Sequence, residues 1–193
     1  MLPFEQLSDL VRKNRSYRRF KESESITKEQ LLRWIDLSRY TASGRNVQPV
    51  KYKVSADATL NTKVFEHLAW AGYLPDWNGP AEGERPSAYI FVLKDTYLGR
   101  NIYCDDGIAL QTILLAAVSE GFGGCIIGSF NREKISLLLN LPDHLELLWV
   151  IAMGKPAEQV VIEPVRDGNI KYWRDNDLVH HVPKRSLEEI VID

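Results

Sequence analysis

The sequence predicts one globular domain in which helices and strands are mixed, and three observations support this. A chain of 193 residues with 45% hydrophobic and 26% charged residues is typical of a single domain with a substantial core. Residues 103–131 combine an apolar helical stretch with a glycine-marked strand. Amphipathic helical patterns and short apolar runs of strand length follow one another along the rest of the chain.

The stretch from Asp105 to Val118 predicts a helix that is covered all round, because its apolar residues fall on every side of a helical wheel. Gly121 follows as the left-handed stop of that helix. Residues 125–130 are typical of a short buried strand, and Gly128 removes a side chain where another group must approach the backbone. A buried helix that leads into such a strand end is a suitable frame for a flat ligand.

The remaining elements follow from local patterns. Residues 2–14 predict an amphipathic helix, and the capping-box sequence at Thr27 starts a second helix that fades near Tyr40. Then come a strand around 52–55, a helix at 59–70, a strand at 88–93, a helix at 132–139 capped by Asn131, a strand at 146–153, short pieces at 160–163 and 170–173, and a short helix in the tail.

The bulk composition excludes several classes of protein. A net charge of −2 and a pI near 6.1 argue against a general binder of nucleic acid or membrane surfaces. Two cysteines are too few for a disulfide framework and are expected to be reduced, buried thiols. No apolar signal core and no run of about 18 apolar residues is present, which predicts a cytoplasmic protein.

No catalytic side chain and no metal site are predicted. His180 and His181 are adjacent, so one backbone does not easily aim both at one metal, and His67 and His144 are isolated. The glycines after residue 120 fit neither a dinucleotide-binding loop nor a phosphate-binding loop, since their spacing and the following residues are wrong.

The segment after the first helix, NRSYRRFK, carries the first candidate binding residues: Arg15, Ser16 and Arg18. One interpretation is a solvated basic turn. The other is an anion clamp, because arginine offers forked donors that match phosphate oxygens and serine adds a short hydrogen bond. A second basic pair, Lys184 and Arg185, precedes the short helix of the tail.

Two loops carry polar and aromatic candidates. In residues 41–49, amide and hydroxyl groups either hydrogen-bond the edge of a heterocycle or hold their own turn. The Gly- and Pro-rich segment that follows residue 70 either plugs the core with its aromatic residues or stacks them on a planar substrate. The candidates are Ser43, Gly44, Asn46 and Gln48 in the first loop, and Trp70, Tyr73 and Trp77 in the second.

Four separated segments together resemble the FMN-dependent nitroreductase-like family: NRSYRRF, ASGRNVQP, DDGIALQTILLAAVSEGFGGCIIGSF and VPKRSLEEIV. They follow the family's order across nearly the whole chain. The resemblance implies an α+β fold, in which helices wrap a central antiparallel sheet. It also implies an intertwined homodimer built from one domain over residues 1–193, with a C-terminal arm from about residue 157.

The resemblance also implies where FMN would bind. Arg15, Ser16 and Arg18 would hold its phosphate, ribityl chain or pyrimidine edge, and Lys184 and Arg185 would close on the phosphate. Backbone groups beside the isoalloxazine would come from the end of the strand, and a polar loop would face the flavin from the other subunit. These two sets are Ile127, Gly128 and Ser129, and Ser43, Gly44, Asn46 and Gln48.

The function implied is that of a flavin oxidoreductase whose chemistry is carried by FMN. NADH or NADPH would donate hydride in a ping-pong reaction, and an electron-poor planar small molecule, such as a nitroaromatic or a quinone, would accept it. Three alternatives stay open: a flavin-binding module without turnover, a family branch that reduces an enone or a halogenated aromatic, and a cofactor-free scaffold.

Overall fold

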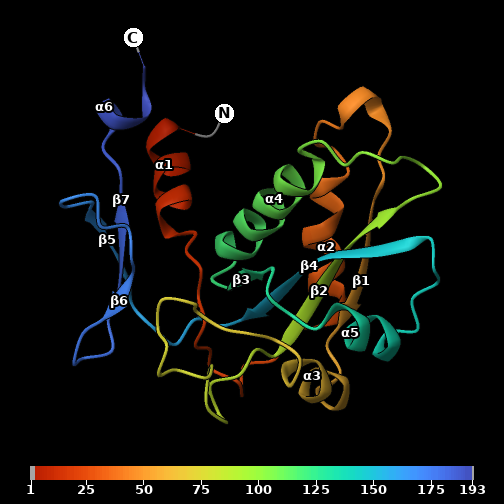
Figure 1. The fold of residues 1–193 in the computed structure, drawn as a ribbon, viewed down its shortest axis with the longest axis horizontal. Coiled ribbons are helices and arrows are strands. Elements are labelled where there is room, and N and C mark those ends of the chain that lie inside the picture. Colours follow the sequence, from red (N-terminus) through yellow and green to blue (C-terminus); the bar gives the residue numbers. More distant parts are fainter. Residues whose placement is uncertain (1–2, 193) are drawn as a thin grey trace.

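The computed structural model describes residues 3–192, so the predicted helix start at Leu2 lies outside the described residues. Figure 1 shows the order of the elements. They are α1 (Phe4–Lys13), α2 (Lys28–Ser38), the 3-10 turn η1 (Gly44–Asn46), β1 (Val50–Ser55), α3 (Ala58–Phe65), β2 (Ala88–Asp95), α4 (Asp105–Ser119), β3 (Gly123–Ile127), α5 (Arg132–Leu138), β4 (Leu145–Gly154), β5 (Val160–Pro164), β6 (Trp173–Arg174), β7 (His180–Lys184) and α6 (Leu187–Ile190).

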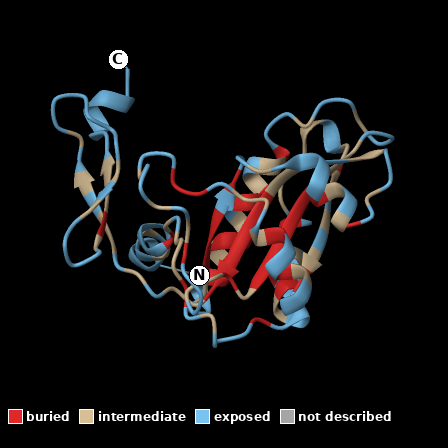
Figure 2. Cartoon of the chain, turned by 60° about the horizontal axis from the view of Figure 1, so that its bottom comes forward, coloured by how far each residue is buried: buried red, intermediate tan, exposed pale blue. Residues whose placement is uncertain are grey.

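An antiparallel sheet of four strands, in the order β1-β2-β4-β3, forms the centre of the molecule. In Figure 2 the buried residues concentrate in this sheet and in the helix faces that pack on it. Successive side chains of β2 point to opposite faces, and both faces are buried. Ala88, Ile90 and Val92 join the core cluster of α2 and α4, whereas Tyr89, Phe91 and Leu93 join that of α3 and α5.

The helices cover both faces of the sheet, which confirms the predicted α+β fold class. α2 and α4 lie on one face, and α3 and α5 lie on the other (Figure 1). The face of α4 that packs on the sheet is buried, while Gly107 and Gln111 are exposed. Within one chain, α4 is therefore not covered on all sides as the sequence predicted. Gly121 has φ of 78° and ends the helix as predicted.

The C-terminal part forms a small sheet of its own, in the order β5-β7-β6, with β5 parallel and β6 antiparallel to β7. We call residues 157–192 the C-terminal arm. In Figure 1 this sheet stands apart from the central one, with α1 nearby, and Figure 2 shows that its surface is mostly exposed. The arm therefore takes little part in the main core.

Several predicted boundaries are wrong. The third helix ends at Phe65 rather than at residue 70, and the strand predicted at 125–130 runs from Gly123 to Ile127, so Gly128 follows it. The predicted piece at 170–173 is a strand only at Trp173 and Arg174, and β7 has no counterpart in the prediction. The capping box at Thr27 and the cap at Asn131 are confirmed.

Candidate functional site

Arg15, Ser16, Arg18 and Lys184 line one hollow of about 300 Å³ between the N-terminal segment, β3, α4 and the arm. The N-terminal segment and the C-terminal arm therefore meet at this hollow. The rest of the lining consists of Asn14, Gln111, Leu114, Gly124, Ile126, Tyr172, His180 and Val182.

The N-terminal segment reaches this hollow because it runs along β3. α1 ends at Lys13 with Asn14 as its C-cap, and Ser16 then forms a parallel bridge with Gly124. The backbone N–H of Tyr17 donates to the carbonyl of Gly124 over 3.1 Å. A Cβ on Gly124 would lie 2.6 Å from the carbonyl oxygen of Ala152, so the residue must be glycine for the sheet to close here.

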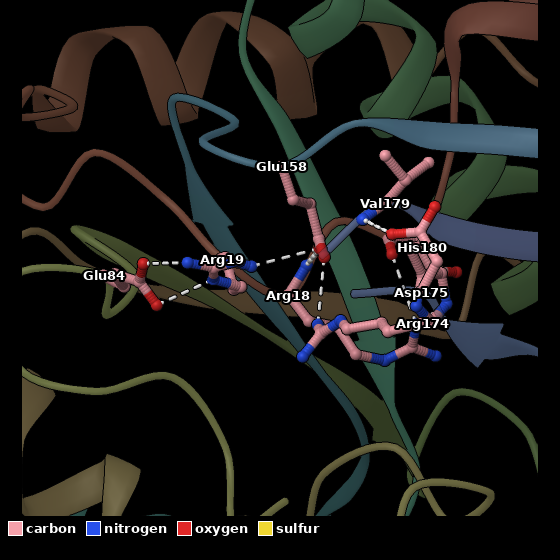
Figure 3. A network of polar contacts seen from close by, with 9 residues as sticks. Arg18, Arg19, Glu84, Glu158, Arg174, Asp175, Val179 and His180 are labelled. Carbon is pink, nitrogen blue, oxygen red and sulfur yellow. Dashed lines mark hydrogen bonds and ion pairs between the residues drawn. The ribbon is translucent and has the colours of Figure 1, made fainter. Parts of the chain in front are cut away.

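A buried carboxylate fixes the same segment from the side of the arm. Glu158, whose side chain is 1% exposed, accepts hydrogen bonds from the backbone N–H groups of Arg18 and Arg19. It also accepts from Arg174 Nη2 over 2.9 Å. Arg19 points away from the hollow and pairs with Glu84 (Figure 3). The network therefore leaves the side chain of Arg18 free to face the hollow.

The cations of this hollow have no carboxylate partner among the described residues. Arg15 Nη2 donates to the carbonyl of Val11, and its buried Nε has no partner among residues 3–192. Burial lowers the pKa of Arg15. Within residues 3–192, the side chains of Arg15, Arg18 and Lys184 form no ion pair with a carboxylate. In contrast, Arg19, Arg33, Arg39, Arg174 and Arg185 each do.

Arg185 lies outside the hollow. Its side chain is half exposed and pairs with Glu189 one helical turn later, at 3.2 Å. Ser186 caps the same short helix. Of the basic pair in the tail, only Lys184 therefore lines the hollow within this chain.

A second hollow, of about 220 Å³, adjoins the first and shares Arg18, Ile126 and Tyr172 with it. Ile127, Gly128 and Ser129 line it at the end of β3. The backbone carbonyl of Ser129 accepts from the N–H of Ala69 over 2.9 Å. The two hollows together form a path from the cation cluster to the glycine after β3, with Arg18 and Tyr172 at the junction.

The polar loop Ser43–Gln48 lines neither of these hollows. The buried carboxylate of Asp105 accepts from Ser43 Oγ over 2.6 Å and from the N–H of Gly44 over 2.8 Å. Ser43 Oγ in turn accepts from the N–H of Gln48. Asn46 and Gln48 have φ of 58° and 53°, a conformation that this network holds. Ser43 and Gln48 line a separate hollow of about 490 Å³ beside α2 and β1.

The three aromatic candidates have different surroundings. Trp70 is 9% exposed, packs against Phe65 and Trp77, and also lines the second hollow. Tyr73 is 45% exposed and contacts Tyr172 of the arm at 4.9 Å between ring centroids. Trp77 lies under the guanidinium of Arg174. Trp70 is thus part of the core as well as of the hollow.

Tyr172 and His180 are two of the lining residues that sequence reasoning missed. Tyr172 lies in a piece predicted as an edge strand, and His180 was considered only as a metal ligand. No pattern in the sequence indicates that the two side chains meet Arg18, because their contact depends on how the arm folds back. The described residues contain no cluster of histidine, cysteine and carboxylate groups suited to a metal ion.

None of the helices between residues 3 and 192 has the length and apolar character needed to span a bilayer.

Several known proteins are similar to this chain. The model of the nitroreductase family matches residues 84–155. The chain is 22% identical to YodC of Bacillus subtilis (strain 168), which is named as an NAD(P)H nitroreductase, over 78% of this chain and 91% of YodC. It is 28% identical to the oxygen-insensitive NADPH nitroreductase of Salmonella typhimurium (strain LT2), over 81% of this chain and 68% of that enzyme.

The fold is also similar to that of an Exiguobacterium sibiricum protein whose crystal structure was solved in complex with FMN. The TM-score is 0.66 at 17% identity, and the match covers 82% of this chain and 90% of the other. At this identity, the likeness concerns the fold alone.

Proposed function

Because this chain is nitroreductase-like in sequence and fold, we propose that it is an FMN-dependent oxidoreductase that uses NADH or NADPH. Its acceptors are electron-poor planar molecules of the nitroaromatic or quinone type. The observation that carries the proposal is the pair of adjoining hollows, with unpaired cations at one end and the glycine after β3 at the other.

The side chains at the first hollow suit the phosphate of FMN. Arg15, Arg18 and Lys184 form no ion pair with a carboxylate within residues 3–192, and the buried Nε of Arg15 has no acceptor. A buried donor without a partner is costly, so an anionic ligand that accepts from it stabilises the site. Ser16 adds a hydroxyl at the same place.

Each part of the path has a role in this proposal. When bound, FMN supplies the chemistry by taking hydride from the nicotinamide and passing electrons to the acceptor. Arg15, Ser16 and Lys184 bind the phosphate, with Arg185 as a further candidate. Arg18, at the junction of the two hollows, would place positive charge beside the flavin, where it would stabilise negative charge on the ring. Backbone groups of Ile127, Gly128 and Ser129 orient the ring.

The second subunit of a homodimer supplies the polar loop in this proposal. Ser43, Gly44, Asn46 and Gln48 lie away from both hollows of their own chain. A loop held rigid by the buried Asp105 is suited to present its amides to a neighbouring molecule. Each flavin would then lie between two chains, and the site would be incomplete in a monomer.

The proposal is tested with the purified protein and FMN. We expect a flavin absorption spectrum after reconstitution, bleaching under anaerobic NADH or NADPH, and steady-state turnover with menadione or a nitrofuran. A protein that binds no FMN would overturn the proposal. A flavin that is bound but not turned over would favour the flavin-binding module instead.

Replacing Arg15 by alanine tests the cation cluster. We expect FMN affinity to fall about ten- to a hundred-fold, because one charge-assisted donor is lost, and the protein to be purified largely colourless. The measurement is a fluorescence titration with FMN. Arg12→Ala is the matched control, since it removes an exposed guanidinium of α1 that lines neither hollow. Unchanged affinity in Arg15→Ala would contradict the clamp.

A further inference from the structure

Two side chains of the C-terminal arm contact the guanidinium of Arg18. The ring of Tyr172 lies against it, with 5.0 Å from Arg18 Cζ to the ring centroid. His180 Nε2 lies 3.4 Å from Arg18 Nη1. The guanidinium also donates to the carbonyl of Ser16, at 3.3 Å. The contacts with Tyr172 and His180 come from residues more than 150 positions away in the sequence.

A hydrogen bond from Arg18 to His180 requires one particular protonation state of the imidazole ring. Arginine has only donors, so Nε2 must be unprotonated to accept from Nη1. The ring is then neutral, with its proton on Nδ1, a buried atom that has no hydrogen-bond partner within residues 3–192. His180 is 1% exposed, and the charged groups that face it are Arg18 from the N-terminal segment, Arg174 from β6 and His181 from β7.

These surroundings keep His180 in the neutral form. Burial, together with the nearby positive charges, lowers the pKa of His180 to about 4. At neutral pH the ring is thus an acceptor for Arg18 rather than a competing cation. A protonated histidine here would repel the guanidinium that lies beside it.

Tyr172 is itself held from two sides. Its Oη accepts from the backbone N–H of Tyr73 over 3.3 Å, and its ring lies 4.9 Å from that of Tyr73. On the other side, its ring centroid is 5.1 Å from that of His180. The phenol ring is therefore fixed between the loop after α3 and β7, with one part of its surface against Arg18.

From this geometry we propose that Tyr172 and His180 are positioning residues for Arg18. They hold its guanidinium at the junction of the two hollows, where the flavin would pass from phosphate to ring. The inference rests on the proposed function, since it specifies how the arm sets the place of the cation beside FMN. The arm is thus part of the site through two side chains that do not themselves carry positive charge.

The first test needs no flavin. In apoprotein with ¹⁵N-labelled histidine, we expect NMR to show His180 neutral between pH 5 and 8, with the proton on Nδ1. Arg18→Met should raise the pKa of His180, because a facing positive charge is removed. A proton on Nε2, or a ring that titrates near pH 6.5, overturns the inference. This result holds whether or not the protein binds FMN.

The second test compares matched variants in the FMN-loaded protein. His180→Leu and Tyr172→Leu should weaken FMN binding about tenfold and shift the flavin to a more negative midpoint potential, because Arg18 is no longer held. His180→Gln keeps an acceptor, and Tyr172→Phe keeps the aromatic face, so both should stay within about twofold of wild type.

Control variants and alternative results separate the two proposals. Asn176→Ala changes an exposed residue of the arm that lines neither hollow, and should leave the potential unchanged. Leucine variants that match wild type, or conservative variants that fail as badly as leucine, overturn the positioning role. Failure of the wild-type protein to bind FMN instead overturns the proposed function, while the NMR result on Arg18 and His180 stands.

Discussion

Gly128 lines the second hollow and also packs against a neighbouring side chain. The sequence predicts that some group comes close to its backbone, and the structure identifies Trp149 as such a group. A Cβ on Gly128 would lie 2.7 Å from the indole ring. Trp149 Nε1 also donates to Asp106 over 2.7 Å, which limits how far the indole can move. The glycine is therefore required by packing, apart from any ligand in the second hollow.

Gly128→Ala should consequently destabilise the protein by about 1–3 kcal/mol, the usual cost of overpacking a well-filled site. Chemical denaturation followed by tryptophan fluorescence measures this. Gly72→Ala is the control, because nothing lies within 4 Å of its added Cβ and its φ is not in the left-handed region. Equal stability of the two variants would mean that Trp149 moves aside without cost.

At the scale of elements, the arm sheet is tied together by His181 of β7. Its Nδ1 lies 3.0 Å from Glu163 of β5, and its Nε2 lies 3.2 Å from Asp175, which follows β6. The ring of Trp173 stacks on it at 4.9 Å and 3°. Hydrogen bonds to Glu163 and then to Asp175 raise the pKa of His181 above 6.5. The imidazolium thus links three parts of the arm.

The arm should therefore lose stability as pH rises. The folded pKa of His181 is above the unfolded value near 6.5, so its contribution is complete below pH 6.5 and disappears as pH passes the raised pKa. Hydrogen exchange of amides in β5 and β7 is the measurement. His181→Gln should remove this pH dependence, and high salt should weaken it, since the group is near the surface. Protection that does not change with pH would exclude this role.

The loop Ser43–Gln48 is held in place by Asp105, the first residue of α4. Asp105→Ala removes the acceptor for Ser43 and Gly44 and should destabilise the protein by about 1–3 kcal/mol. If the loop completes the site of a second subunit, FMN affinity should fall as well. Thermal unfolding and FMN titration measure the two effects. Asp143→Ala, an exposed carboxylate in the turn before β4, should change neither.

The central elements could be predicted from the sequence because their patterns are local. The apolar run of β2, the capping box at Thr27 and the stop at Gly121 each lie within a few residues. β7 could not be predicted, because Pro183 lacks the backbone N–H that an inner strand normally uses. In addition, the strands that pair with β7 are β5 and β6, which a local pattern does not reveal. The site shows the same division: Arg15 belongs to a motif, whereas Tyr172 does not.

For the whole molecule, exposed apolar side chains lie at both ends of the described chain. On α1, Phe4 is 77% exposed, and Leu7 and Val11 are each more than 40% exposed. In the tail, Leu187, Ile190, Val191 and Ile192 are all more than half exposed. Apolar surface gathered on an amphipathic helix is typical of a protein–protein interface, which supports the proposed homodimer.

Leu7→Glu should therefore shift the protein from dimer to monomer, since it places a charge in the proposed apolar interface. Light scattering after size-exclusion chromatography measures the mass, and FMN affinity should fall in parallel. Gln6→Glu adds the same charge one residue away on the helix and should leave the dimer intact. A wild-type protein that elutes as a monomer of 22.1 kDa would contradict the homodimer.

Glu158 joins regions of the chain that are far apart in sequence, because one carboxylate accepts from the backbone of residues 18–19 and from Arg174. Limited proteolysis just before residue 158 would thus disturb residues 18–19, although the cut lies far from them in the sequence. Residues 18–19 would lose one of their anchors although every peptide bond among them stays intact. A cut at the start of the C-terminal arm would then change the structure of the N-terminal segment.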